Sequence, residues 1–379
     1  MRLLQRNQIP RSKNRRGWLS LLSEIAHNAL ASVLFCLAFV FAVGCAPSHQ
    51  SHQPSIEFTQ IPHAVDVGGP EDLEHINGRV IDRVPGAQVV IFARSEGSWW
   101  VQPFRTGPIT DIGKDGNWNN VTHLGSDYAA LLVARDYQPP FRVSDLPPLS
   151  SDVLAVAITK GSTKKPADMP TIHFSGYDWN VRSGLGDAGG EPCDYQTSNI
   201  WVDDDGYLHL LMGQKADQYL CAGLGLARGF GYGTYRFVVS DSAHFPPSAL
   251  FSMFVRSHRE DPDNRAGFSV QLSKWGKTDE RNAVFVVQPY YIPGNTAQFT
   301  VPAGVTTYVF RWKPGSVTFN IFAGNSAKPR AGVMSHTFNS SVPVPSTETV
   351  KLDFHDIHHS QNGVHHPVEI VVQKFEYLP

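Results

Sequence analysis

Three short apolar runs in one region of the chain constrain the fold most strongly. They cover residues 249–255, 267–273 and 283–288. These runs are rich in β-branched and aromatic residues and have polar loops between them, which predicts consecutive strands of an antiparallel sheet. Because side chains alternate between the two faces of a strand, Gly267, Ser269 and Gln271 would share one face of the middle strand.

Three segments around these strands resemble the core of family 16 glycoside hydrolases, which are jelly-roll enzymes of the concanavalin A-like lectin/glucanase superfamily. The segments are GFSVQLSKWG (267–276), NAVFVVQPYY (282–291) and FRWKPGSVTFNIFAG (310–324). The resemblance extends over residues 171–379. It implies an all-β fold with a C-terminal antiparallel β-sandwich.

The catalytic triplet of that family is absent here. In the family the middle strand carries Glu-x-Asp-x-Glu, in which the first Glu is the nucleophile and the last is the acid/base. The matching positions hold Gly267, Ser269 and Gln271, none of which ionises near neutral pH. Retaining hydrolysis needs two carboxyl groups, and an amide cannot act as a general acid and base. The substitution predicts a cleft that binds glycan without cutting it.

The resemblance also suggests which residues border that cleft. Ser269 and Gln271 offer hydroxyl and amide groups for hydrogen bonds to sugar hydroxyls. The family pattern adds Tyr232, Trp275, Gln288 and Tyr290. Each of these four could equally belong to the sandwich core. The predicted partner is a polysaccharide or surface glycan.

Composition excludes several other classes of function. A chain of 379 residues suits two domains, and a net charge of -2 gives no electrostatic basis for nucleic-acid binding. The sequence contains no Walker loop, dinucleotide fingerprint or zinc-ligand spacing, so we predict no cofactor.

Residues 72–160 predict a smaller β-sandwich that precedes the jelly roll. Strand-length runs alternate with turn signals there, and the Lys/Pro/Ser-rich stretch 161–170 predicts a linker to residues 171–379. Trp99, Trp100 and Trp118 are candidates for an exposed platform that stacks on sugar rings. The alternative is that these three rings belong to the core.

Residues 1–45 predict an export signal, because a basic region precedes the apolar run 29–44. The sequence Ala42-Val43-Gly44-Cys45 resembles a bacterial lipobox, which implies that Cys45 is lipidated. The alternatives are an ordinary signal peptide and a signal anchor. The lipobox hypothesis places the protein in the cell envelope, anchored to the outer or cytoplasmic membrane, with residues 46–71 as a tether.

Cys193 and Cys221 remain as candidates for a disulfide in an exported protein. A simple hairpin register, however, places Cys221 opposite a residue near Leu210. Two separate buried thiols are therefore the alternative.

Histidines are concentrated in the run HDIHHSQNGVHH. They are His355, His358, His359, His365 and His366. Such a cluster could bind a transition metal. The Asn-Gly pair and Pro367 predict a loop, in which histidines are usually solvated. In the resembled enzymes this region is a loop over the cleft, so ligand contact is a further alternative. We predict no metal site.

Two other functions fit the sequence. An active hydrolase or transglycosylase would recruit carboxylates from loops, such as Glu260, Asp261 or Asp279. A structural envelope protein would use the jelly roll to contact another protein and would have a closed or filled cleft.

Overall fold

The structure, a computed structural model, describes residues 53–66, 68–163, 169–215, 218–256, 267–277, 281–325, 332–357, 364 and 366–379. Residues Pro54–Pro379 pack as one unit. The regular structure of the described residues is almost entirely strand, as predicted. The short 3-10 helices η1 Thr197–Asn199 and η2 Pro293–Asn295 accompany it. No helix in these ranges is long and apolar enough to span a membrane. Cys45 and the predicted export signal lie outside the described residues.

The N-terminal part of this unit contains two antiparallel sheets that share a core. The first sheet consists of β1 Ser55–Gln60, β2 Gly69–Ile81 and β6 Asn117–Leu124. The second consists of β3 Gln88–Ser95, β4 Ser98–Gln102, β5 Ile109–Thr110, β7 Asp127–Val133, β8 Arg142–Val143 and β9 Val153–Lys160. Ile91 packs with Trp118 between the sheets, whereas Phe92 belongs to a second cluster on the other side. Burial on both faces explains the continuous apolar sequence of β3.

Part of the predicted tether 46–71 is wrong. Ser55–Gln60 forms β1 and pairs with β2, and Ile56 is buried. Phe58 packs edge-on against Trp118, with 5.7 Å between the ring centroids. The stretch is mostly polar, but the apolar residues Ile56 and Phe58 alternate with polar ones, and this short alternation is sufficient for an edge strand.

The exposed tryptophan platform does not form. Trp99, Trp100 and Trp118 are all buried, with at most 7% of their surface exposed. Trp99 and Trp118 lie in different core clusters. Trp100 lies between Arg142 and Phe141. The core alternative therefore holds for all three rings.

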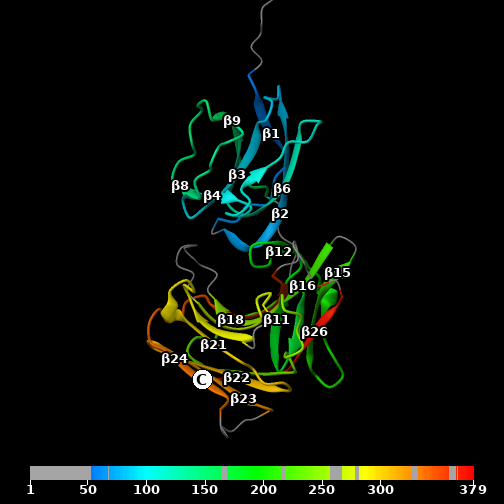
Figure 1. Ribbon diagram of the computed structural model, residues 1–379, viewed down its shortest axis with the longest axis vertical. Helices are drawn as coiled ribbons and strands as arrows, with labels where there is room; N and C mark the ends of the chain where they lie inside the picture. Colours follow the sequence, from blue (N-terminus) through cyan, green and yellow to red (C-terminus); the bar gives the residue numbers. More distant parts are fainter. Residues whose placement is uncertain are drawn as a thin grey trace, which may run out of the picture. The chain divides into compact units, whose positions relative to one another are not determined.

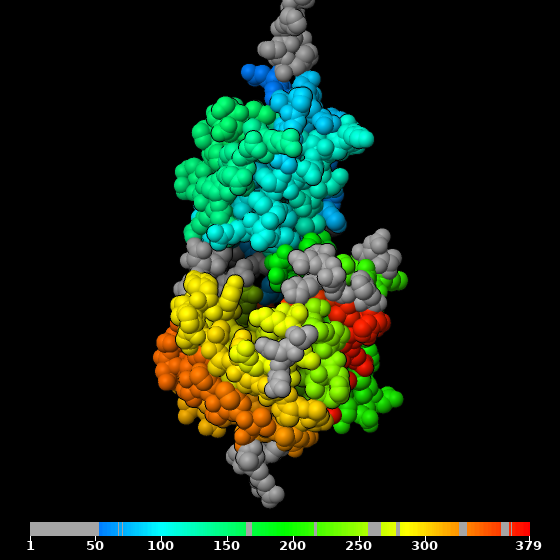
Figure 2. Space-filling model, viewed as in Figure 1, coloured from blue at the N-terminus to red at the C-terminus, as the bar shows by residue number. Residues whose placement is uncertain are grey.

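The C-terminal part is an antiparallel β-sandwich, as predicted (Figure 1). We call the sheet that carries the candidate site the front sheet. Its strands in order are β10 Thr171–Phe174, β11 Tyr177–Val181, β16 Gln218–Leu226, β25 Thr349–Asp356, β18 Ala249–Arg256, β19 Gly267–Leu272, β20 Ala283–Val287 and β21 Thr296–Phe299. The back sheet contains β14 Ile200–Val202, β15 Leu208–Lys215, β26 Val368–Leu378, β17 Gly233–Val239, β22 Thr306–Lys313, β23 Ser316–Ala323 and β24 Met334–Phe338. In Figure 2 the yellow and orange part of this sandwich covers much of the visible face, and red atoms of the C-terminal segment appear at its right edge.

The predicted consecutive strands are present as β18, β19 and β20. They pair antiparallel in sequence order. Phe268, Val270 and Leu272 belong to the core between the two sheets. Ser269 and Gln271 therefore lie on the opposite face of the front sheet, as the two-residue period predicts.

Cys193 and Cys221 form a disulfide, with 6.0 Å between their Cα atoms. The hairpin β12 Gly184–Asp187 and β13 Pro192–Tyr195 explains this pairing. β13 runs parallel to β16, so Tyr195 lies opposite Cys221 and Cys193 is two residues away. The prediction from the hairpin register took into account only β15 as a neighbour of Cys221. It did not include β13, which carries Cys193, and the pairing therefore stayed open.

Replacing both cysteines by serine should lower the free energy of unfolding by about 3 kcal/mol, because the crosslink spans 28 residues. Urea unfolding of Cys193→Ser/Cys221→Ser and wild type would measure this difference. Dithiothreitol should destabilise the wild type to a similar degree and leave the double variant unchanged. Equal stability of the oxidised wild type and the variant would contradict a stabilising crosslink.

Candidate functional site

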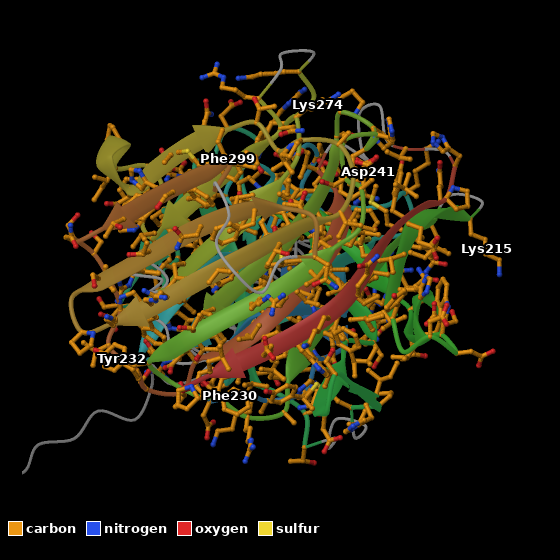
Figure 3. The ribbon with its side chains drawn as sticks, turned by 90° about the horizontal axis from the view of Figure 1, so that it is seen from below. Lys215, Phe230, Tyr232, Asp241, Lys274 and Phe299 are labelled. Carbon is orange, nitrogen blue, oxygen red and sulfur yellow. A yellow bond between two sulfur atoms is a disulfide. The ribbon has the colours of Figure 1, made fainter. Side chains whose placement is uncertain are left out.

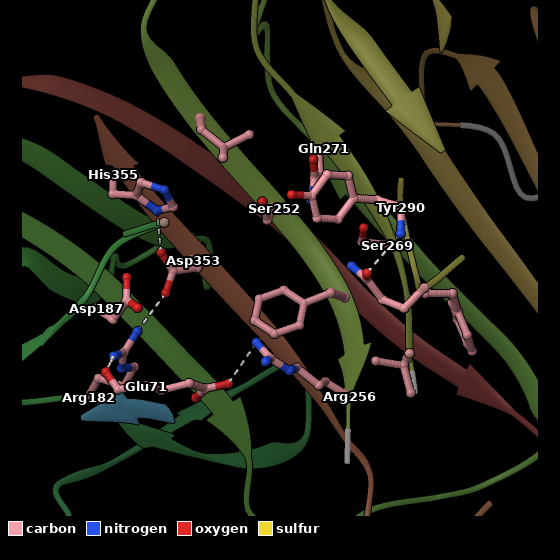
Figure 4. A pocket seen from close by; sticks show the side chains of 17 residues that line it. Glu71, Arg182, Asp187, Ser252, Arg256, Ser269, Gln271, Tyr290, Asp353 and His355 are labelled. Carbon is pink, nitrogen blue, oxygen red and sulfur yellow. Dashed lines mark hydrogen bonds and ion pairs between the residues drawn. The ribbon is translucent and has the colours of Figure 1, made fainter. Parts of the chain in front are cut away.

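A cavity of about 250 Å³ lies on the outer face of the front sheet. Its floor comes from alternate residues of three neighbouring strands, β19, β18 and β25. Gly267, Ser269 and Gln271 line it, together with Gln288 and Tyr290, which were also predicted from the family pattern. In Figure 4, Ser269, Gln271 and Tyr290 lie on one side of the cavity and the charged residues on the other.

The position of Gly267 leaves no room for a side chain. A Cβ atom built there would lie 2.6 Å from the Val255 backbone oxygen on β18. A backbone oxygen cannot move aside in the way that the end of a flexible side chain can. The backbone of this protein therefore leaves no space for a side chain at position 267, where the family resemblance leads one to expect a nucleophile.

Glu71 on β2 lies in the charged half of the cavity and is paired with cations. Lys351 Nζ on β25 donates to both of its carboxylate oxygens, at 2.7 and 2.8 Å, and Arg256 Nη1 lies 3.6 Å away. Burial alone would raise the pKa of Glu71, but the charges of Lys351, Arg182 and Arg256 outweigh burial and lower the pKa to about 2. Glu71 is therefore ionised at neutral pH.

Asp353 on β25 receives hydrogen bonds from three side chains. Arg182 Nη1 donates to Oδ2 at 2.9 Å, and the Tyr195 hydroxyl donates at 3.1 Å. His355 Nδ1 lies 2.7 Å from Oδ1. Burial raises the pKa of the Tyr195 hydroxyl well above its usual range; Arg182 opposes this shift and Asp353 adds to it. Tyr195 thus keeps its proton and donates it in a hydrogen bond to Asp353.

His355 presents an open nitrogen. Its side chain is buried and lines the cavity, and Nε2 has no hydrogen-bond partner among the described residues. Nδ1 is occupied by the Asp353 carboxylate, so Nε2 is the ring nitrogen that is left for a ligand. A hydroxyl group in the cavity could hydrogen-bond to this nitrogen.

The predicted histidine loop is wrong at its start, because His355 and Asp356 belong to β25. Asp356 accepts a hydrogen bond from the Val364 amide, and His366 is exposed. The residues His358, His359 and His365 lie outside the described ranges. Within those ranges no group of three His, Cys, Asp or Glu side chains could hold a metal ion.

Two predicted site residues do not line the cavity. Tyr232 directly precedes β17 (Figure 3) and packs against Trp312, with 5.1 Å between the ring centroids. Trp275 follows β19 in a turn and has a positive φ of 50°. The loop carboxylates Glu260, Asp261 and Asp279 lie outside the described residues.

Most of the charged half of the cavity was not predicted from the sequence. Lys351, Asp353 and His355 alternate with the buried Leu352 and Phe354. This two-residue alternation of polar and apolar side chains could have predicted a strand with one face in the core and the other face toward a functional site. For Glu71 and Arg182, which come from distant segments, we find no comparable signal.

Comparisons with known proteins find similarity to solved structures only at low identity. No family model matches this chain, and no curated protein matches it. A β-glucanase from Bacillus licheniformis is 14% identical, with 53% of this chain and 92% of that chain covered and a TM-score of 0.43. A pseudo-β-1,3-glucanase of Mycobacterium tuberculosis is 15% identical, with 53% and 90% covered and a TM-score of 0.39. A family 16 endo-glucanase from Bacteroides ovatus is 14% identical, with 53% and 94% covered and a TM-score of 0.39.

Proposed function

We propose that this protein binds a neutral polysaccharide in the front-sheet cavity without hydrolysing it. The observation that carries the proposal is the strip formed by Gly267, Ser269 and Gln271. It provides hydroxyl and amide groups, but no carboxyl group, on the floor of the cavity. In a cell-envelope setting, with Cys45 as the lipid anchor, such a cavity would attach the protein to a glycan outside the cytoplasm.

The carboxylates that line the cavity support the proposal. They are Glu71, Asp187 and Asp353. Glu71 and Asp353 are held by cationic donors, and a glycosidase needs one carboxyl group that is protonated before the reaction. A pKa of about 2 for Glu71 is incompatible with that role at neutral pH. Asp187 accepts a hydrogen bond from the Gly190 amide and lies 3.1 Å from His123 Nε2.

The test uses protein without residues 1–45 and a panel of insoluble β-glucans, galactans and xyloglucan. We expect at least one polysaccharide to retain the protein and none to release reducing ends. Release of reducing ends would overturn the proposal and favour a hydrolase with carboxylates from loops. Absence of both retention and release would favour a structural role in the envelope.

Gln271→Ala should weaken retention about fivefold, because the change removes an amide that both donates and accepts hydrogen bonds. The measurement is a depletion isotherm on the retaining polysaccharide. Gln298→Ala is the matched control, since Gln298 on β21 is exposed and does not line the cavity.

Trp275→Ala distinguishes the cavity from the wider cleft of the resembled family. Because Trp275 lies outside the cavity lining, we expect its substitution to leave retention unchanged. Weaker binding by Trp275→Ala but not by Gln271→Ala would place the binding surface elsewhere.

A further inference from the structure

The front-sheet cavity adjoins a second cavity of about 600 Å³. The residues that line both are Glu71, Asp187, Gly189, Arg256 and Tyr290. Because these residues line both cavities, the two cavities are adjacent, and together they form a candidate groove. The other wall of the second cavity belongs to the N-terminal sandwich. It includes Trp100, Gln102, Phe104, His123 and Phe141.

We propose that this groove binds one extended neutral oligosaccharide, whose sugar units continue from β19 onto the N-terminal sandwich. The proposal rests on the proposed function and extends it: the N-terminal sandwich becomes part of the binding site. The first cavity alone is smaller than most ligand sites, which measure about 300–1,000 Å³, whereas the second lies within that range.

Direct contacts join the two walls of the groove. Lys351 of the front sheet holds the Glu71 carboxylate of β2, and Arg182 Nη2 donates to the Glu71 backbone oxygen at 2.6 Å. His123 of β6 lies 3.1 Å from Asp187 of β12. These contacts order both walls before a ligand arrives, which reduces the entropy cost of binding an extended chain.

The charges along the second cavity favour a neutral ligand. His123 faces Asp187, Arg256 faces Glu71, and the Arg105 guanidinium lies 5.4 Å from the centre of the Phe141 ring. A charged ligand would have to compete with these existing partners. A chain of neutral sugars needs only hydrogen bonds and apolar contact.

Aromatic rings on both walls supply that apolar contact. Phe141 is 39% exposed on the N-terminal wall, and Tyr290 is 66% exposed on the front-sheet wall. Phe141 packs edge-on against Trp100, whose other partner is Arg142 at 4.6 Å from the ring centroid. Trp100 and the Arg105 guanidinium both contact the Phe141 ring, and the part of the ring that stays exposed is the candidate platform for the apolar face of a sugar ring.

The test compares oligosaccharides of different length on protein without residues 1–45. The probes are β-1,3-glucan, β-1,4-glucan and β-1,4-galactan oligosaccharides of three and six units, measured by titration calorimetry. We expect a hexasaccharide to bind at least tenfold more tightly than the trisaccharide of the same linkage. Phe141→Ala should weaken hexasaccharide binding about fivefold and leave trisaccharide binding unchanged.

Two further variants make the outcome decisive. Ile158→Ala, a control on the same sandwich, replaces a residue that is 60% exposed and lines neither cavity, and it should bind both lengths as wild type does. Phe104→Ala repeats the test at a second position of the N-terminal wall.

Different results would contradict the extended groove and the proposed function. Equal affinity for both lengths, or unchanged hexasaccharide binding by Phe141→Ala and Phe104→Ala, would overturn the extended groove even where Gln271→Ala weakens binding. Absence of binding by every probe would overturn both proposals.

Discussion

Replacing Gly267, Ser269 and Gln271 by Glu, Asp and Glu is expected to destabilise the protein by about 3 kcal/mol and to produce no release of reducing ends. The triple variant introduces the acidic residues that the family resemblance leads one to expect at these positions. A side chain at 267, however, begins with a Cβ atom 2.6 Å from the Val255 backbone oxygen. Strands β18 and β19 would have to separate before the new carboxylate could reach the cavity.

The first of the three substitutions should account for most of the loss. Gly267→Ala alone should lower the free energy of unfolding by about 2 kcal/mol. Gly294→Ala is the matched control, because a Cβ atom there would meet nothing within 4 Å, and it should change stability by no more than about 0.5 kcal/mol. Urea unfolding measures both differences.

The stability and activity measurements together test whether the side chains at these three positions are all that prevents hydrolysis. A triple variant that is as stable as wild type and releases reducing ends would show that the backbone can accept a nucleophile at position 267. An unstable and inactive variant is the result expected if the backbone cannot accept it. In that case no substitution confined to these three positions would produce hydrolysis.

The second large effect concerns the ion pair between Lys351 and Glu71. Lys351→Met should destabilise the protein by about 3 kcal/mol at pH 7, because a buried carboxylate loses its nearest cation. The side chains are 10% and 23% exposed, so solvent screens this pair only weakly. Lys374→Met is the control: Lys374 is 49% exposed, pairs with Glu376 at 3.4 Å, and should contribute less than about 1 kcal/mol.

The same pair predicts how stability depends on pH. The pKa of Glu71 is lowered from 4.5 to about 2, so the folded state binds this proton less readily than the unfolded state. The stabilisation is therefore complete above about pH 4.5 and is lost as the pH falls toward 2. The difference between wild type and Lys351→Met should shrink over this window, as unfolding at pH 7, 5 and 3.5 would measure.

Removing the charges of both Glu71 and Lys351 shows how much of the lost stability comes from the ion pair and how much from side-chain packing. Glu71→Gln/Lys351→Met should be more stable at pH 7 than Lys351→Met alone, because no unpaired carboxylate remains. If the double variant were the less stable of the two, the loss would come from packing and not from the charge on Glu71.

The sequence was sufficient to predict which residues share a face within a single strand. The alternation in GFSVQLS predicted that Gly267, Ser269 and Gln271 share one face; these residues line the cavity, whereas Phe268 and Val270 between them belong to the core. The residue types there also limit the chemistry of these three positions, since none of the three side chains can exchange a proton near neutral pH. Both conclusions follow from the two-residue period of an extended backbone, which does not depend on distant parts of the chain.

The tertiary structure alone decided which distant side chains meet. Glu71 and Lys351 are 280 residues apart in sequence, and Arg182 reaches Asp353 across 171 residues. The parallel approach of β13 to β16 brought Cys193 to Cys221, and the closeness of β18 and β19 excluded a side chain at Gly267. Such contacts depend on which strands become neighbours. That choice is made by many small packing and hydrogen-bond energies summed over the whole chain, and no local pattern records it.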